Sequence, residues 1–397
     1  MKKIISFLFA TVFIMPILGQ TETETIKTAT DLILNKKYES AFKLLQDFDQ
    51  KNGSPDVVLL KEEIAINYFV TSMMHQIFAF KDLEKNESIV DYRGKEGSFG
   101  MYPFPVNEIL DSLIKIYPTN FKLYKGLGDF YYDVQQRYED KWLIEDSIIS
   151  DLIIKNYQVV IDHNLANYNI YFITGLEFLQ LKKNKESIPF FLKSIELKKD
   201  FADAHYNVAY AYLFVDDREN ALKYAKNSLK LYTDASSKSD AARMIGEIYS
   251  ELKDDKNAII NYELANKIDP ENYYNLKPLL NLYVKTENSK SKQTLIAFFN
   301  LDPTNPTIYN DLNNIYYDNK KGDDLIAFLK EQLSTNKDNS KVLGSLYFYL
   351  AKLYLDTDKK IAKEYFITSK EIFSKIFNAD HTVFKAIDEG IKQTENN

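Results

Sequence analysis

The sequence predicts an all-α fold, an α-solenoid of stacked helix-turn-helix repeats, and three observations lead to it. The chain of 397 residues is 45% hydrophobic and 27% charged, which is typical of a globular protein. It contains only 12 Gly and 10 Pro, which disfavours both disorder and a turn-rich β fold. Residues 168–270 repeat one pattern of small and aromatic side chains three times in succession. A period of this kind indicates a repeat architecture.

The first two copies of the pattern align at a shift of 34 residues. Similar residues then coincide as Gly175 with Ala209, Phe178 with Tyr212, Ser187 with Ala221, Ser194 with Ser228, and Leu197 with Leu231. The third copy keeps the order with Ile245, Gly246, Tyr249, Ala258, Tyr262, Ala265, Ile268 and Pro270. This motif resembles the tetratricopeptide repeat, in which a large-small pair, two aromatics and an alanine precede a closing proline. The resemblance implies helix pairs that stack into a superhelix with a concave inner surface.

Small residues are expected where two helices of a pair cross, because only a small side chain permits close approach. Gly175 and Gly246 on first helices, and Ala258 on a second helix, mark such points. Large aromatic residues must fill the remaining space, as Phe191 and Tyr262 do on second helices. Ala225 departs from the aromatic expected at the same position. Asp216-Asp217 and Asp254-Asp255 are expected to begin or precede second helices, where carboxylates complement exposed N–H groups.

Four segments are predicted along the chain. Residues 1–19 have the layout of a signal peptide, because Lys2 and Lys3 precede an apolar run that is too short to span a bilayer comfortably. Residues 20–117 form a divergent helical region with a long helix over about 56–80 and a loop at 81–106. Residues 118–376 form the repeat array, and residues 377–397 form a capping helix and tail. Cleavage after Gly19 would give an exported, periplasmic or secreted chain of bacterial type with no membrane span.

Two irregular stretches interrupt this pattern. The loop at 81–106 is rich in glycine, proline and aromatic residues, and it is interpreted as a surface insertion or as a loop that covers the groove. The insertion at 133–146 contains the only tryptophan, Trp142, which is either a packing residue or an anchor for a partner.

The resemblance also implies where a partner binds. In this family the first helix of each pair lines the concave surface, chiefly at its second, fifth, ninth, twelfth and thirteenth positions. The candidate groove residues are Phe172, Leu176, Leu179, Tyr206, Tyr210, Phe214, Arg243, Glu247, Lys277 and Asn281. Lys277 and Asn281 match a pair that clamps a terminal carboxylate in some family members, but Asp311 in the next copy would repel a carboxylate. The apolar residues of this groove come from the copies that begin at Tyr168 and Ala202. Whether they are exposed or covered by the chain itself is left open.

Several classes of function are disfavoured by composition. The net charge of −7 argues against a nucleic-acid partner, which requires a basic face. Cysteine is absent, and the four His are far apart in the sequence, so neither a metal site nor a cofactor is predicted. No catalytic motif is recognisable, and the chain is predicted not to be an enzyme, with activity hidden in residues 20–117 as the weakest alternative.

We therefore expect a scaffold or adaptor of the bacterial cell envelope that binds a peptide or partner helix in the concave groove. The alternative is a periplasmic binder of solutes or glycans that uses the aromatic groove together with Trp142. Neither the partner nor the oligomeric state can be read from the sequence.

Overall fold

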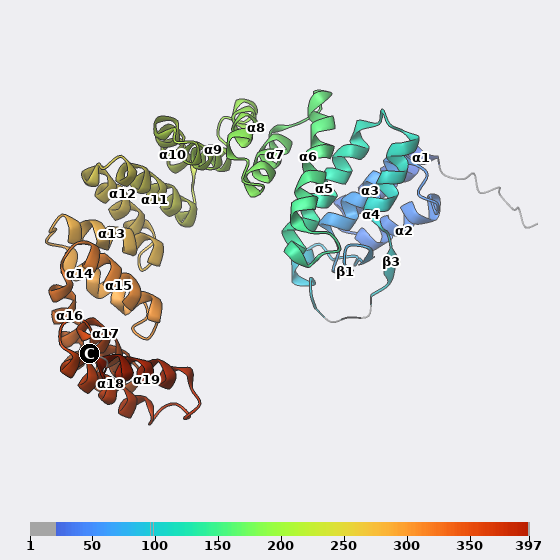
Figure 1. Cartoon of the computed structure of the whole chain (residues 1–397). Helices are drawn as coiled ribbons and strands as arrows, with labels where there is room; N and C mark the ends of the chain where they lie inside the picture. Colours follow the sequence, from blue (N-terminus) through green and yellow to red (C-terminus); the bar gives the residue numbers. More distant parts are fainter. Residues whose placement is uncertain (1–20, 96, 98, 396–397) are drawn as a thin grey trace, which may run out of the picture. The chain divides into compact units, whose positions relative to one another are not determined.

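The computed structural model describes residues 21–95, 97 and 99–395, and the predicted signal peptide at 1–19 lies outside them. Helices dominate the chain (Figure 1). Their bounds are α1 Glu22–Leu34, α2 Tyr38–Phe48, α3 Pro55–Asn67, α4 Val106–Ile116, α5 Phe121–Tyr138, α6 Asp146–Asp162, α7 Tyr168–Gln180, α8 Asn184–Leu197, α9 Ala202–Phe214, α10 Arg218–Leu231, α11 Ala235–Glu251, α12 Asp255–Ile268, α13 Tyr273–Lys285, α14 Ser291–Asn300, α15 Pro306–Asp318, α16 Gly322–Thr335, α17 Ser340–Tyr354, α18 Lys359–Phe373 and α19 Thr382–Glu395. Two short 3-10 helices, η1 Ile89–Asp91 and η2 Glu139–Lys141, and three strands, β1 Thr71–Met73, β2 Ile77–Ala79 and β3 Met101–Pro103, complete the regular structure of the described residues.

Neighbouring helices pack as hairpins, which confirms the predicted solenoid of helical repeats. The chain divides into two compact units, the first ending at Lys199 and the second beginning at Asp200. This division falls inside the segment 118–376 that the sequence predicts as one array. The boundaries at 118 and 377 stay predictions.

Acidic residues begin the second helices, as the sequence predicts. The Asp217 carboxylate accepts a hydrogen bond from the backbone N–H of Asn220 at 3.1 Å, and Asp254 accepts one from Asn257 at 3.1 Å. The side-chain amides of Asn220 and Asn257 donate to the same carboxylates, and these side-chain bonds, together with the backbone ones, lower the pKa of both aspartates. The two side chains thus cap α10 and α12, whose first N–H groups have no partner within the helix.

The predicted crossing points at Gly175 and Gly246 are each filled by an aromatic ring from the partner helix. A Cβ atom built on Gly175 would lie 2.7 Å from the Phe191 ring, and one on Gly246 would lie 2.9 Å from the Tyr262 ring. The same relation joins Gly128 with Tyr157, Gly344 with Phe373, and Gly390 with Phe366. Because these distances are too short for a real side chain, glycine is what lets the ring reach the backbone of the first helix.

The pair α9 and α10 meets the same requirement differently. Ala209 on α9 and Ala225 on α10 are fully buried and belong to one core cluster. The first helix carries a Cβ atom here, and the second helix carries a methyl group instead of a ring. Ala225 replaces the expected aromatic residue, and Ala209 stands where Gly175 and Gly246 stand in the neighbouring copies. The two departures therefore compensate for each other.

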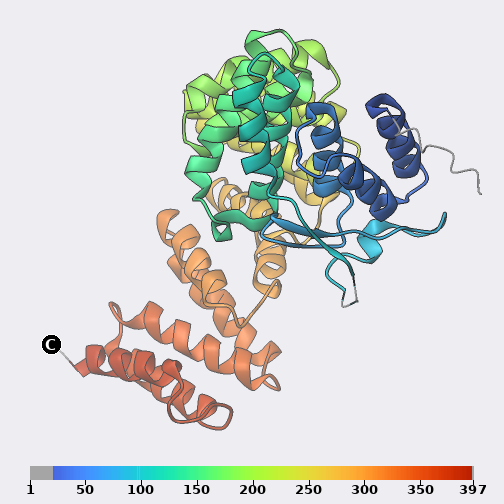
Figure 2. The same cartoon turned by 90° about the vertical axis from the view of Figure 1, so that its right-hand side faces the viewer.

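The long helix predicted over 56–80 is wrong. Helix α3 ends at Asn67, and the chain then forms β1 and β2, which pair antiparallel with β3 from the predicted loop. Figure 2 shows these strands beside the first helices of the same unit. Phe78 on β2 is fully buried in the core of this unit. A continuous apolar run has no period that separates a buried strand from a helix, which explains the error.

A buried polar cluster holds the turn between β1 and β2 against α5. His75 has no exposed surface, and it lies with Met74 in the left-handed region, at φ of 51° and 48°. Its Nε2 lies 2.8 Å from Asp133 Oδ2, while its Nδ1 lies 3.0 Å from Ser72 Oγ and 3.1 Å from the Tyr138 hydroxyl. Left-handed residues other than glycine cost about 1 to 3 kcal/mol and persist only where the surroundings fix them.

The only tryptophan also holds the turn between β1 and β2 in place. Trp142 is 7% exposed, its Nε1–H donates to the Met74 carbonyl at 2.8 Å, and its ring packs against Phe130 and Tyr131. Helix α5 also runs on to Tyr138, so the predicted insertion at 133–146 is partly helical. Trp142 is thus a packing residue, and the interpretation as a partner anchor is not supported by its position.

Lys61 on α3 is a buried amine. It has no exposed surface, and its Nζ donates to Gln46 Oε1 at 2.6 Å and to Asn52 Oδ1. The Nζ also lies 4.7 Å from the centre of the Phe104 ring. These neutral partners do not fully replace water, and burial lowers the pKa of Lys61 to about 8.

The contribution of Lys61 to the free energy of unfolding should increase as the pH is raised from about 8 to about 10.4. The lower limit is the pKa of Lys61 in the folded chain, and the upper limit is the pKa of an unfolded lysine. In this interval the unfolded chain holds the proton and the folded chain does not, so raising the pH favours the folded state. Urea titrations across the interval should show a shallower rise for Lys61→Met than for wild type. The exposed Lys51→Met is the control, and equal slopes in Lys61→Met and wild type would contradict the assignment.

Candidate functional site

Five of the predicted groove residues come together in one cleft of the second unit. This aromatic cleft has a volume of about 540 Å³ and lies between α9 and α11. It is lined by Tyr206, Tyr210, Leu213, Phe214, Arg243, Met244, Glu247 and Glu251. Residues four apart in a helix share a face, so each wall follows from the sequence spacing. One wall carries the ladder Tyr206, Tyr210, Phe214, and the other carries Arg243, Glu247, Glu251.

The aromatic wall is open to solvent over most of its length. Tyr210 is 41% exposed and Phe214 is 59% exposed, with their ring centres 4.7 Å apart. Tyr206 is half-buried, lies against Tyr232, and has its pKa raised by burial. In the second unit the patch is therefore exposed rather than covered by the chain.

The charged wall is only partly neutralised. Arg243 donates to Asp240 at 2.9 Å, and although burial disfavours its charge, this hydrogen bond raises the pKa of Arg243. Its guanidinium also lies 5.9 Å from the centre of the Tyr274 ring on α13. Glu251 forms an ion pair with Arg218. Glu247 stands between these two, exposed, and forms no ion pair with any residue that the structure describes.

The predicted residues Lys277 and Asn281 line a second cleft, between α13 and α15. This polar cleft has a volume of about 420 Å³ and is lined by Lys277, Pro278, Asn281, Asp311, Asn314, Ile315 and Asp318. Lys277 Nζ lies 2.7 Å from Asp311 Oδ1, and the Tyr273 hydroxyl donates to the same carboxylate. Because its charge is already paired, Lys277 is poorly placed to clamp a terminal carboxylate.

The other three predicted residues belong to the first unit. Phe172, Leu176 and Leu179 lie on α7 and are all half-buried. Phe172 packs against Phe191 of α8, with ring centres 5.8 Å apart.

Sequence reasoning missed five residues that line the two clefts, namely Met244, Pro278, Asn314, Ile315 and Asp318. Asn314 and Asp318 occupy the ninth and thirteenth positions of the copy that begins at Pro306, so the same positional rule would have found them. Met244 occupies the sixth position of its copy, which the rule does not include. It reaches the aromatic cleft from beside Arg243.

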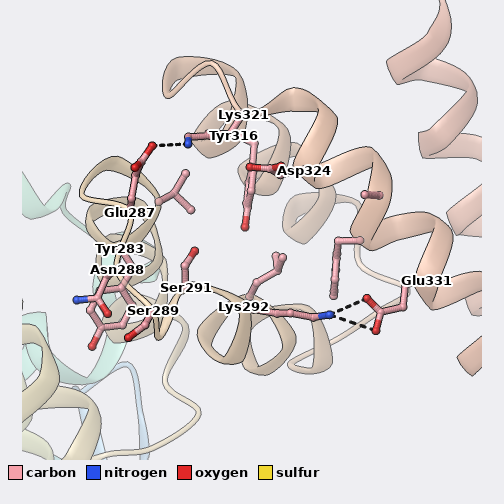
Figure 3. Close-up of a pocket in the computed structure, with 14 residues that line it drawn as sticks. Tyr283, Glu287, Asn288, Ser289, Ser291, Lys292, Tyr316, Lys321, Asp324 and Glu331 are labelled. Carbon is pink, nitrogen blue, oxygen red and sulfur yellow. Dashed lines mark hydrogen bonds and ion pairs between the residues drawn. The ribbon is translucent and has the colours of Figure 1, made fainter.

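A third cavity, the junction pocket, has a volume of about 450 Å³ and lies where α13 and α14 meet α15 and α16 (Figure 3). Its lining includes the buried apolar residues Val284, Leu295 and Phe328. Two ion pairs cross it, Lys321 with Glu287 at 2.6 Å and Lys292 with Glu331 at 3.0 Å. None of the predicted groove residues lines it.

The described residues offer little for metal or membrane chemistry. They contain no group of three or more His, Asp or Glu placed to hold a metal ion. No helix within the described ranges is both long and apolar enough to cross a membrane. The set Ser72, His75 and Asp133 has the order of a proton relay, but the imidazole is fully buried, so the set serves the turn rather than a substrate.

The helix pairs and their glycine-aromatic contacts define the class of this protein, an α-solenoid with open clefts on its first helices. The family model of the tetratricopeptide repeat matches residues 168–201 and 244–272, which cover α7 with α8, the C-terminal part of α11 and all of α12. The chain therefore contains tetratricopeptide repeats in these two stretches.

Several solved structures are similar to this chain. A tetratricopeptide repeat protein from Parabacteroides merdae is 16% identical, with a TM-score of 0.43 over 69% of this chain and 99% of that one. MamA from Desulfovibrio magneticus RS-1 is 16% identical, with a TM-score of 0.36 over 44% of this chain and 92% of that one. YrrB, described as a tetratricopeptide repeat protein with an unusual peptide-binding site, is 14% identical, with a TM-score of 0.36 over 48% and 96%. A comparison with curated proteins gave no match.

Proposed function

We propose that this protein is a protein-interaction scaffold that binds a peptide segment or a helix of a partner in the aromatic cleft. The observation that carries the proposal is the exposure of Tyr210 and Phe214 on adjacent turns of α9, facing a charged wall on α11. Exposed aromatic residues clustered on a rigid helix, with a charged rim, are typical of sites where binding energy concentrates. The cell-envelope location of this scaffold stays a prediction from residues 1–19.

The dimensions of the cleft favour a chain over a compact solute. The ladder from Tyr206 to Phe214 extends over two helical turns, which is about 12 Å. This length suits three or four residues of an extended peptide or two turns of a helix. A glycan could stack on the same rings, so the experiment must distinguish the two kinds of ligand.

Tyr210→Ala with Phe214→Ala should weaken peptide binding by at least about tenfold while leaving the fold intact. Peptides would be selected on the full chain from a phage-displayed library of random 12-residue sequences, and affinities measured by fluorescence polarisation. The matched control is Ile260→Ala with Leu264→Ala, two exposed apolar residues four apart on α12. The control should bind within about twofold of wild type.

Two results would contradict the proposal. Selected peptides that bind the Tyr210→Ala, Phe214→Ala variant as tightly as wild type would place the site elsewhere. A library that yields no peptide, together with binding of a glycan array that depends on Tyr210, would assign the cleft to sugars instead.

A further inference from the structure

We infer that the partner segment is basic, with a Lys or Arg side chain that lies along the aromatic wall and ends at Glu247. This inference rests on the proposed function and specifies the charge of the ligand. It follows from how the charges of the aromatic and polar clefts are paired, and from where the unpaired ones lie.

The cations of both clefts are each already paired with a carboxylate of the chain, although the buried Nε of Arg243 has no hydrogen-bond partner among the described residues. Arg243 is paired with Asp240 at 2.9 Å, and Lys277 is paired with Asp311 at 2.7 Å. An acidic ligand would have to compete with these internal carboxylates for each cation. The cost of separating an ion pair that is partly withdrawn from water makes such an exchange unfavourable.

The carboxylates are not all satisfied. The charged residues that line the two clefts are two cations, Arg243 and Lys277, and four carboxylates, Glu247, Glu251, Asp311 and Asp318. Glu247 and Asp318 are exposed, and across the described part of the chain neither lies within ion-pair distance of a basic side chain. The free charges on the two clefts are therefore negative, on α11 and on α15.

The position of Glu247 sets the chemistry of the complementary side chain. It is the middle member of the charged ladder, on the wall opposite Tyr210 and Phe214 in the same cleft. A Lys or Arg side chain has an apolar stem and a charged end, so its stem can cover an aromatic ring while its cation meets a carboxylate. A ring face also attracts a cation directly. Tyr210 and Glu247 together thus select for a basic residue next to an apolar one.

Asp318 gives the segment a direction. It lies in the polar cleft on α15, and the Arg243 guanidinium near the Tyr274 ring links the aromatic cleft to α13, whose Lys277 lines the polar cleft. A segment that continues from the aromatic cleft along the first helices therefore meets a second free carboxylate. We expect the ligand to carry a second basic residue on the side that leaves the aromatic cleft.

The experiment neutralises the two free carboxylates in the full chain. Panning of the random 12-residue library on wild type should enrich Lys and Arg at least about twofold over the input. Affinity for the best peptides should fall at least about fivefold in Glu247→Gln with Asp318→Asn, and should weaken as salt is raised. The control, Glu219→Gln with Glu371→Gln, removes the same charge from exposed positions on second helices and should change affinity less than about twofold.

The outcomes separate this inference from the proposed function. Peptides that require Tyr210 and Phe214 but show no excess of Lys or Arg would overturn the basic ligand and leave the cleft as the site. An equal loss of peptide affinity in the control variant and in the Glu247→Gln, Asp318→Asn variant would also overturn it. Such a result would show that the peptides are attracted by the net charge of the chain. Peptides that ignore the two aromatic residues would instead refute the cleft itself.

Discussion

Replacing His75 by alanine should lower the free energy of unfolding of the first unit by about 3 kcal/mol. The imidazole is the shared partner of Asp133, Ser72 and Tyr138, and its loss leaves these groups without a bond that they make in a buried site. Burial alone would raise the pKa of Asp133, but hydrogen bonds from His75 and Arg137 outweigh it and lower that pKa. Without His75 the carboxylate keeps only Arg137.

Hydrogen exchange is the measurement that isolates this effect, because it reports each unit separately. Amides that hold the sheet, such as the Phe104 N–H that donates to the Gln76 carbonyl at 2.8 Å, should exchange about a hundredfold faster in His75→Ala. His163→Ala is the control, since His163 is exposed. Unchanged protection in the sheet of His75→Ala would show that the turn is held without the polar cluster.

The effect of Gly246→Ala on the free energy of unfolding should change sign when its contact residue Tyr262 is replaced by alanine. In wild type, Gly246→Ala places a Cβ atom 2.9 Å from the Tyr262 ring and should cost about 1 to 3 kcal/mol. In a Tyr262→Ala background the same change should stabilise by up to about 1 kcal/mol, because the methyl group enters vacated space and alanine favours helix. The natural Ala209 and Ala225 are the precedent for this pairing.

Thermal and urea unfolding of the four proteins in this cycle give the coupling energy directly. Gly322→Ala is the control, since a Cβ atom at Gly322 would meet nothing within 4 Å. It should be neutral or slightly stabilising. A Gly246→Ala cost that is the same with tyrosine or alanine at 262 would mean that the ring does not determine the need for glycine.

The repeat pattern predicted the helix pairs because their contacts are local and periodic. Gly175 and Phe191 are sixteen residues apart, and the motif records both sides of their contact. The strands of the first unit could not be predicted in the same way. The contact of His75 with Asp133 joins residues that are 58 positions apart and lie outside the repeats. No periodic pattern in the sequence predicts it.

The candidate site was predicted to the extent that it depends on helical spacing. Tyr206, Tyr210 and Phe214 share a face whatever their surroundings, so their ladder follows from the sequence. Pairing between helices does not follow from spacing. The ion pair of Lys277 with Asp311 bridges two repeats, and it turns a candidate carboxylate clamp into a closed contact.

The junction pocket has a mechanical consequence. Two ion pairs lie around it, Lys321 with Glu287 and Lys292 with Glu331, and three of these four side chains are more than half exposed, while Lys321 is 33% exposed. Exposed ion pairs resist separation by only about 0.2 to 1 kcal/mol each, far less than a buried aromatic contact. Raising the ionic strength should therefore loosen these two links at the rim of the pocket, while the buried contact of Phe299 on α14 with Phe328 on α16 keeps the helices together.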